Sequence, residues 1–232
     1  MSLDVTAPDD SLPALRALVA DRGVRVVVCD LDGVLRRFDP SLWDELDAMT
    51  GAAAGTSFEA VLGHPYLREV VRGRGTHARW RELAAAHLIS TGCEPSLARR
   101  AVERWASTPA VVDRRVREEL LRLRASGVPV FVLTNGTDRI PEELAALGLE
   151  DVVGEDGRFL LNTADLGAAK PEPEAYERAR ERIGRVLGQD LPPERLALLD
   201  DSPGNVEGAA DRGWHAVLHR PEGTGRAAPG LP

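Results

Sequence analysis

The sequence predicts an α/β fold in which a doubly wound parallel sheet forms the core and an all-helical cap is inserted into it. Short apolar runs rich in β-branched residues alternate with helical patterns, which is typical of strands buried on both faces of a parallel sheet. Nearly a hundred residues separate the first two runs, and they contain helical patterns but no convincing strand. Polar residues directly follow several of the runs, where α/β sheets bind ligands.

The core elements follow one another in a regular order. A helical pattern over residues 11–22, with Ser11 as its expected N-cap, precedes the first strand at 24–29. The later strands are expected at 128–133, 196–199 and 214–218, with helices at 114–125, 173–186 and 204–212. Helical segments between strands predict right-handed crossovers and helices on both faces of the sheet.

The long insertion predicts the cap. Apolar residues recur near helical spacing over 41–49, 56–62, 77–88 and 95–105, and we expect Trp43, Trp80 and Trp105 to pack in the interior of the cap. We therefore expect the following division of the chain: core at 1–35 and 111–219, cap at 36–110, and a disordered tail at 220–232, which is rich in Pro, Gly and Ala.

Composition excludes several classes of partner. The chain has 232 residues and a formal net charge of −8, which argues against general binding to nucleic acid or to an anionic membrane. Because no apolar run approaches the roughly 20 residues of a membrane span and no signal peptide is evident, we expect a cytoplasmic protein with a small ligand. Cys29 and Cys93 are expected to be reduced thiols. The sequence carries no signal for the oligomeric state.

Four acidic residues follow two of the predicted strands. Asp30 and Asp32 come directly after the first strand, and Gly33 allows the chain to turn there. Asp200 and Asp201 come directly after the strand at 196–199. Carboxylates that point to a common centre repel one another unless a hard cation joins them, so the pattern predicts Mg²⁺ coordination.

Two further segments offer contacts to an anion. Thr134, Asn135 and Gly136 open a loop after the second strand, where a hydroxyl and backbone amides can bind a phosphate. Lys170 precedes Pro171 and is the only lysine among 29 basic residues. A lysine that persists in an arginine-rich chain suggests a site that needs a compact ammonium. We therefore predict that Thr134, Asn135 and Lys170 bind phosphate.

Together, these segments resemble the four motifs of the haloacid dehalogenase (HAD) superfamily of hydrolases. The motifs occur in order as Asp30-Leu31-Asp32-Gly33-Val34, Thr134-Asn135-Gly136, Lys170-Pro171 and Asp200-Asp201, and the resemblance spans roughly residues 24–218. It implies a Rossmann-like core with a helical cap inserted just after the first motif.

The resemblance also implies a role for each motif residue. Asp30 would attack phosphorus and bind Mg²⁺, and Asp32 would act as general acid and then as base, with its backbone carbonyl on the metal. Dehalogenase-like members of the superfamily lack the second acid, so Asp32 favours phosphate esters. The remaining roles are phosphoryl binding by Thr134 and Lys170 and metal binding by Asp200 and Asp201.

The leading hypothesis is a Mg²⁺-dependent phosphatase, a phosphoric monoester hydrolase, that acts on a small phosphorylated metabolite through an aspartyl-phosphate intermediate. One alternative is a phosphomutase resembling β-phosphoglucomutase, and another is a non-catalytic module that binds a phosphorylated ligand. Asn205 is interpreted either as orienting the loop of the second aspartate pair or as only beginning a helix. The arginines Arg36, Arg37 and Arg68 are interpreted either as contacts for an anionic substrate or as surface residues and salt-bridge partners.

Overall fold

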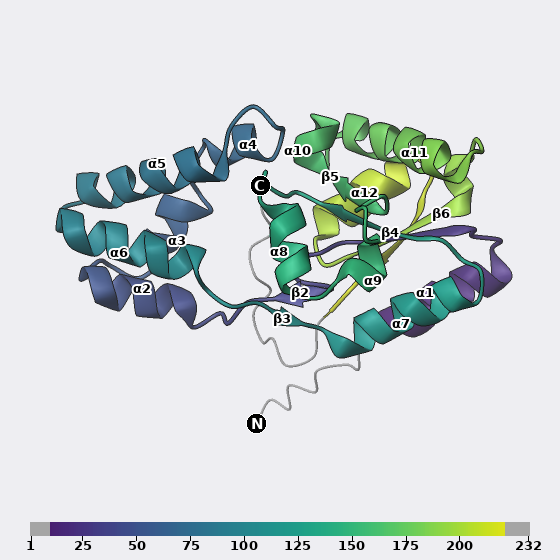
Figure 1. Ribbon diagram of the computed structural model, residues 1–232, viewed down its shortest axis with the longest axis horizontal. Helices are drawn as coiled ribbons and strands as arrows, with labels where there is room; N and C mark the ends of the chain where they lie inside the picture. Colours follow the sequence, from purple (N-terminus) through teal and green to yellow (C-terminus); the bar gives the residue numbers. More distant parts are fainter. Residues whose placement is uncertain (1–9, 221–232) are drawn as a thin grey trace, which may run out of the picture.

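The structure, a computed structural model, describes residues 10–220 and has a five-stranded parallel sheet among the helices of its core, on the right in Figure 1. The strands lie in the order β5–β4–β1–β6–β7 and comprise β1 (Val26–Cys29), β4 (Val130–Thr134), β5 (Leu160–Asn162), β6 (Leu196–Asp200) and β7 (His215–Leu218). Each neighbouring pair is parallel. Since helices cover both faces, the predicted doubly wound α/β fold is confirmed.

The two faces of the sheet have separate hydrophobic cores because successive residues of a strand point to opposite sides. Val27 and Cys29 of β1 belong to the core that includes side chains of α1 (Ser11–Asp21), α7 (Arg114–Ala125), α8 (Ile140–Ala146) and α9 (Glu150–Val153). Val26 and Val28 belong to the opposite core, with α11 (Pro173–Leu187) and α12 (Pro203–Asp211). Shorter connections are α10 (Thr163–Leu166) and a 3₁₀ turn (Pro193–Arg195).

Most core elements agree with the sequence prediction, but no bounds were predicted for α8, α9, β5 and α10, and the start of α1 differs. The predicted strands correspond to β1, β4, β6 and β7 with ends shifted by up to two residues. Strand β5 was not predicted because a run of three residues is too short to show any periodicity. The expectation that Ser11 caps α1 is wrong: the helix begins at Ser11, Asp10 is the N-cap residue, and Ser11 Oγ lies 2.8 Å from His219 Nδ1.

The insertion between β1 and β4 forms a helical layer, here called the cap, beside the core (Figure 1). Its helices are α2 (Leu42–Thr50), α3 (Thr56–Val61), α4 (Leu67–Val70), α5 (His77–Ser90) and α6 (Pro95–Ala106), of which α4 was not predicted. The cap has its own hydrophobic core. Trp80 is buried and donates its Nε1–H to Val61 O at 2.9 Å, while Trp43 and Trp105 pack against the same cluster, which agrees with the predicted packing role.

Two short strands, β2 (Arg36–Arg37) and β3 (Val111–Val112), join the cap to the core. They pair antiparallel, so the chain leaves the core and returns to it at one place. The domain boundaries expected after residues 35 and 110 lie beside this pair, and the division into domains stays a prediction.

Three contacts attach the other end of the cap to the core loops. The backbone N–H of His77, at the start of α5, donates to Asp138 Oδ1 at 2.7 Å. Arg72 Nε donates to Glu172 Oε1 at 3.0 Å, and Gly73 packs directly against the backbone oxygen of Ala164. Asp138 and Glu172 lie shortly after Asn135 and Lys170 in the sequence. The cap therefore contacts the two loops that carry these motif residues.

Several further expectations concern the chain as a whole. Within residues 10–220, no helix is both long and apolar enough to cross a membrane. Cys29 and Cys93 are buried free thiols, as expected. Apart from Arg220, the tail expected at 220–232 lies outside the described residues.

Candidate active site

The predicted site residues gather at the carboxyl edge of the sheet. Asp30 follows β1, Thr134 ends β4 and Asp200 ends β6, and β1 lies between the other two strands. Because parallel strands end at the same edge, these three residues are brought together by the sheet itself. Lys170 reaches the same place from the loop before α11. Residues more than a hundred positions apart in the sequence thus form one cluster.

Lys170 lies at the centre of this cluster. Its Nζ lies 2.8 Å from Asp30 Oδ1 and 2.6 Å from Asp200 Oδ2, and its side chain is 1% exposed. Burial alone would lower the pKa of Lys170, but the neighbouring carboxylates of Asp200 and Asp30 outweigh it and raise the pKa above the ordinary value. The ammonium therefore stays charged and neutralises part of the acidic cluster.

Asn135 holds the backbone of Lys170 in place. Its side-chain Nδ2 donates to Lys170 O at 2.9 Å, and its Oδ1 accepts from Lys170 N at 2.8 Å. This reciprocal pair fixes the loop of Lys170 against the loop after β4. The side-chain amide of Asn135 is thus engaged with Lys170, and phosphate binding by Asn135 stays a prediction.

Asp30, Asp200 and Asp201 form a compact carboxylate group. One oxygen from each can be chosen so that all three lie within 4.8 Å of one another. Burial and the charge of Asp200 raise the pKa of Asp30 well above its usual range, although Lys170 acts in the opposite direction. The same two causes raise the pKa of Asp201 to about 6. Burial and mutual repulsion thus both disfavour the ionised carboxylates, so the cluster favours an additional positive charge.

This group suits a hard divalent cation. Three carboxylates face a single ammonium, so the cluster carries excess negative charge when all three are ionised. Carboxylate oxygen is the donor that Mg²⁺ prefers, and the group offers no nitrogen or sulfur ligand that would favour zinc or copper. The residues present therefore fit the predicted metal.

The second aspartate pair is fixed by its own loop. Asp200 Oδ1 accepts from the backbone N–H of Ser202 and from Asn205 Nδ2, each at 2.9 Å. Asn205 thus orients Asp200, one of the two readings of that residue. Asp201 packs against Gly33, where any Cβ would lie 2.0 Å from Asp201 Oδ2. A glycine is required here both by this contact and by its φ of +86°.

Asp32 is not one of the three grouped carboxylates, although its charge contributes to the raised pKa of Asp201, and it has a partner that the sequence did not predict. Arg36 Nε lies 2.6 Å from Asp32 Oδ1, and Arg36 Nη2 lies 2.9 Å from Asp32 Oδ2. A further bond joins Arg36 Nη1 to Glu143 Oε2 at 2.7 Å. Arg36 is therefore a buried salt-bridge partner. Glu143 is one of two acidic residues in the first turn of α8, and no sequence pattern distinguishes it as a partner of Arg36.

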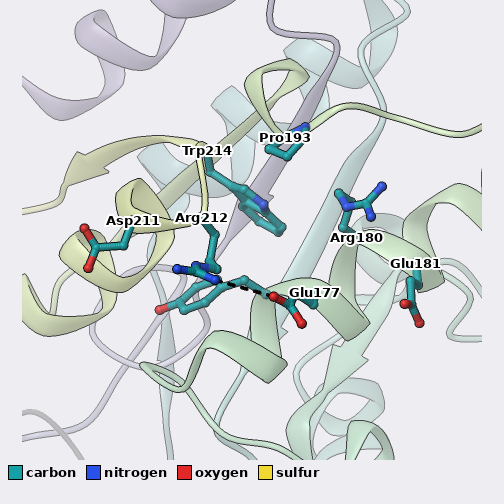
Figure 2. A pocket seen from close by; sticks show the side chains of 8 residues that line it. Glu177, Arg180, Glu181, Pro193, Asp211, Arg212 and Trp214 are labelled. Carbon is teal, nitrogen blue, oxygen red and sulfur yellow. Dashed lines mark ion pairs between the residues drawn. The ribbon is translucent and has the colours of Figure 1, made fainter.

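A separate surface hollow of about 410 Å³ lies elsewhere on the core (Figure 2). Its lining includes Trp214, which precedes β7, and Pro193, which precedes β6, so it lies near the amino ends of these strands. The motif residues follow the carboxyl ends. The hollow is therefore distinct from the candidate active site.

A family model for haloacid dehalogenase-like hydrolases matches residues 24–213. Among solved structures, a HAD family enzyme of Bacteroides thetaiotaomicron in complex with magnesium and inorganic phosphate is 19% identical over 85% of this chain and 95% of its own, with a TM-score of 0.61. The L-2-haloacid dehalogenase of Xanthobacter autotrophicus with chloropropionic acid covalently bound is 20% identical over 83% and 76%, with a TM-score of 0.56.

A predicted HAD-like hydrolase of Porphyromonas gingivalis is also similar, with 19% identity over 84% of this chain and 91% of its own and a TM-score of 0.58. A search among curated proteins gives no significant match. Similarity to solved structures at about 20% identity establishes only a shared fold. The family model matches most of the chain and therefore establishes the family. The chain belongs to the haloacid dehalogenase-like hydrolases.

Proposed function

We propose that the protein is a Mg²⁺-dependent phosphatase that hydrolyses a small phosphorylated metabolite through an aspartyl-phosphate intermediate. The observation that carries the proposal is the position of Lys170 Nζ between Asp30 and Asp200, next to the carboxylate of Asp201. This cluster combines a nucleophilic carboxylate, a fixed cation and a metal-binding group at one edge of the sheet. These are the components that phosphoryl transfer requires.

In the first half-reaction, a carboxylate oxygen of Asp30 attacks phosphorus. A new bond forms between Asp30 and phosphorus, the bond from phosphorus to the ester oxygen breaks, and the departing oxygen takes a proton from Asp32. Because Asp30 Oδ1 already contacts Lys170 Nζ and the backbone N–H of Leu31, we assign the nucleophilic role to Oδ2. The alcohol product then leaves.

In the second half-reaction, water attacks the phosphorus of the intermediate. Asp32, now ionised, takes a proton from the water, the bond between phosphorus and Asp30 breaks, and inorganic phosphate is released. Thr134, the backbone amides after Asn135 and the ammonium of Lys170 hold the phosphoryl oxygens in both steps. Every residue returns to its starting state, which permits turnover.

Mg²⁺ is the proposed cofactor, held by Asp30, Asp200 and Asp201, with the backbone carbonyl of Asp32 as a further ligand. When bound, it neutralises negative charge on the phosphoryl oxygens and so permits an anionic nucleophile to approach them. The acidic group described above is compatible with this role.

Asp32 separates this proposal from a dehalogenase. Displacement of a halide needs no acid, because the halide leaves as a stable anion, whereas an alkoxide leaving group needs a proton. Solved structures of similar fold include both a magnesium and phosphate complex and a dehalogenase, so fold alone does not decide between the two. A phosphomutase would share the first half-reaction and return the phosphoryl group to a sugar.

The test is phosphate release from a panel of phosphorylated metabolites, measured with Mg²⁺, with EDTA and for the Asp30→Asn variant. Asp44→Asn, at an exposed position of α2, is the matched control. We expect release only with Mg²⁺, full activity in the control and a loss of at least about 10³-fold for Asp30→Asn. Phosphate release that survives Asp30→Asn would contradict the proposal. An isomeric sugar phosphate without free phosphate would favour the mutase, and tight binding without turnover would favour the binding module.

A further inference from the structure

Arg36 donates a hydrogen bond to each carboxylate oxygen of Asp32. The guanidinium binds Asp32 in a two-bond geometry, with Nε 2.6 Å from Oδ1 and Nη2 2.9 Å from Oδ2. Such paired bonds fix the direction of a carboxylate as well as its position. The Asp32 side chain is 27% exposed, so contacts with solvent alone would leave it free to turn. Its direction is thus set by Arg36.

Arg36 is itself held from three sides. Its third nitrogen, Nη1, lies 2.7 Å from Glu143 Oε2 on α8, and its guanidinium carbon lies 5.1 Å from the centre of the Phe38 ring. Its backbone N–H donates to Leu31 O at 2.7 Å, and its carbonyl accepts from Gly33 N at 2.8 Å. With a side chain that is 5% exposed, Arg36 is a rigid support and not a flexible surface cation.

The geometry also limits what Asp32 can do while both bonds are present. Each carboxylate oxygen accepts one guanidinium N–H, so on each oxygen one lone pair faces Arg36 and the other is the position for a proton. A protonated oxygen is a poorer acceptor than a carboxylate oxygen, so the bond from Arg36 to the oxygen that carries the proton is weakened. The bond from Nη2 to Oδ2 is the longer one, and Nη2 can release it while Nε continues to hold Oδ1.

We propose that Arg36, anchored by Glu143, is a positioning residue that holds Asp32 through Oδ1 while Oδ2 delivers the proton to the leaving group. This inference rests on the proposed phosphatase function. In the step concerned, the O–H bond at Oδ2 breaks, the proton goes to the ester oxygen as its bond to phosphorus breaks, and Asp32 becomes the carboxylate. Arg36 touches neither substrate nor phosphorus and acts only through Asp32.

A positioning role predicts that the effect of removing Arg36 depends on the leaving group. The p-nitrophenolate ion leaves without a proton, whereas the alkoxide of a glycerol phosphate needs one. We expect Arg36→Met to lower kcat for glycerol 2-phosphate by about tenfold or more, because a mobile acid is misplaced, and to change kcat for p-nitrophenyl phosphate by less than about threefold. KM should stay the same for both compounds.

The neighbouring arginine provides a matched control. Arg37 stands in the same strand but pairs with Asp113 Oδ2 at 3.0 Å, away from Asp32. We expect Arg37→Met to leave the ratio of the two kcat values unchanged. Glu143→Gln, a milder change that weakens only the outer anchor, should shift the ratio in the same direction as Arg36→Met and by less. It also covers the case in which Arg36→Met does not fold.

Equal losses for both compounds in Arg36→Met and Glu143→Gln would overturn the proposal, and so would an unchanged ratio or a faster reaction with glycerol 2-phosphate. A crystal structure of Arg36→Met or Glu143→Gln gives a readout independent of turnover: a displaced or disordered Asp32 carboxylate supports the proposal, and an unmoved one overturns it. Failure of the phosphatase proposal is distinguishable, because the wild-type protein would then release phosphate from neither compound and from no member of the metabolite panel.

Discussion

The ammonium of Lys170 lies 2.8 Å from the carboxylate of Asp30 at a depth where both side chains are almost wholly buried. Lys170 is the only lysine of the chain, and its loop is fixed by the amide of Asn135. An ion pair in such a place is costly to break, because the charge that remains is both buried and unpaired. The ion pair in the candidate active site is therefore expected to contribute to the stability of the folded protein as well.

Replacement of Lys170 by methionine should destabilise the metal-free protein by about 3–5 kcal/mol at pH 8, because Asp30 and Asp200 lose their common cation. Without the ammonium, the buried carboxylates of the folded state bind protons more readily, and a protonated carboxyl group is no longer an unpaired charge. The loss of stability should therefore be smaller at pH 5 than at pH 8. Urea unfolding in EDTA at the two pH values measures the difference.

The control for this measurement is Arg79→Met, which removes an exposed ion pair with Glu82. We expect it to cost less than about 1 kcal/mol at either pH. A loss for Lys170→Met no larger than that of the control would contradict the importance of the buried pair.

Mg²⁺ should stabilise the protein, and the effect should grow with pH. Burial, together with the charge of Asp200, raises the pKa of Asp201 to about 6 in the metal-free protein. Below this pH a proton occupies the carboxylate and competes with the metal, and above it the ionised form is ready to bind. At a concentration about 100-fold above Kd we expect a Tm increase of about 5–10 °C at pH 8.

The same addition at pH 5 should raise the Tm by clearly less. Differential scanning calorimetry with Mg²⁺ and with EDTA at both pH values measures this, and Na⁺ at equal ionic strength is the control. A Tm increase that is equal at both pH values would show that the metal does not bind the carboxylate group through Asp201.

Replacement of Gly33 should be unfavourable for two reasons: its backbone conformation and its contact with Asp201. Its φ of +86° makes any other residue strained, and an added Cβ would lie 2.0 Å from Asp201 Oδ2. Gly33→Ala must therefore displace the Asp201 carboxylate in addition to a backbone cost of about 1–2 kcal/mol. We expect the Mg²⁺ concentration for half-maximal activity to rise about tenfold or more.

Gly51→Ala is the matched control because Gly51 has a φ of +66° with no atom within 4 Å of an added Cβ. It should show a similar backbone cost in urea unfolding and an unchanged requirement for Mg²⁺. If both variants retain the wild-type Mg²⁺ requirement, the contact between Gly33 and Asp201 does not influence the metal.

The sequence allowed the core of the site to be predicted because the motif residues stand directly at the ends of apolar strands. Asp30 and Asp200 could be assigned to one edge of a sheet without knowledge of the strand order, since all parallel strands end there. Strand β5 was missed because its three residues, Leu160–Asn162, are identified only by their pairing with β4. Pairing is a tertiary property that no local pattern contains.

Arg36 shows the corresponding limit at the site. In a chain with 29 basic residues, an arginine gives no local sign that it will be buried. Its burial depends on Asp32, four residues away, and on Glu143, which is 107 residues away. The contact to Asp32 was within reach of sequence reasoning, whereas the contact to Glu143 follows only from how α8 packs beside the first motif.

Docking of the cap on the core should depend on Asp138. Thr76 is the N-cap residue of α5, and Asp138 Oδ1 accepts from the N–H of the next residue, His77, so this carboxylate joins the start of the helix to the core. Asp138→Ala should weaken this attachment by about 1–2 kcal/mol. Amide hydrogen exchange would then be faster in the first turn of α5 than in the wild-type protein, while the sheet keeps its protection.

Glu82→Ala is the control for this last change, because Glu82 lies on the same helix, is largely exposed and pairs only with Arg79 among the described ion pairs. It alters the surface of α5 without touching the core, so exchange in the first turn should stay near the wild-type rate. Faster exchange in both variants would show that the first turn of α5 opens independently of its contact with the core. Faster exchange in Asp138→Ala alone identifies the carboxylate as the attachment, since only that variant removes a bond between the cap and the loop that follows Asn135.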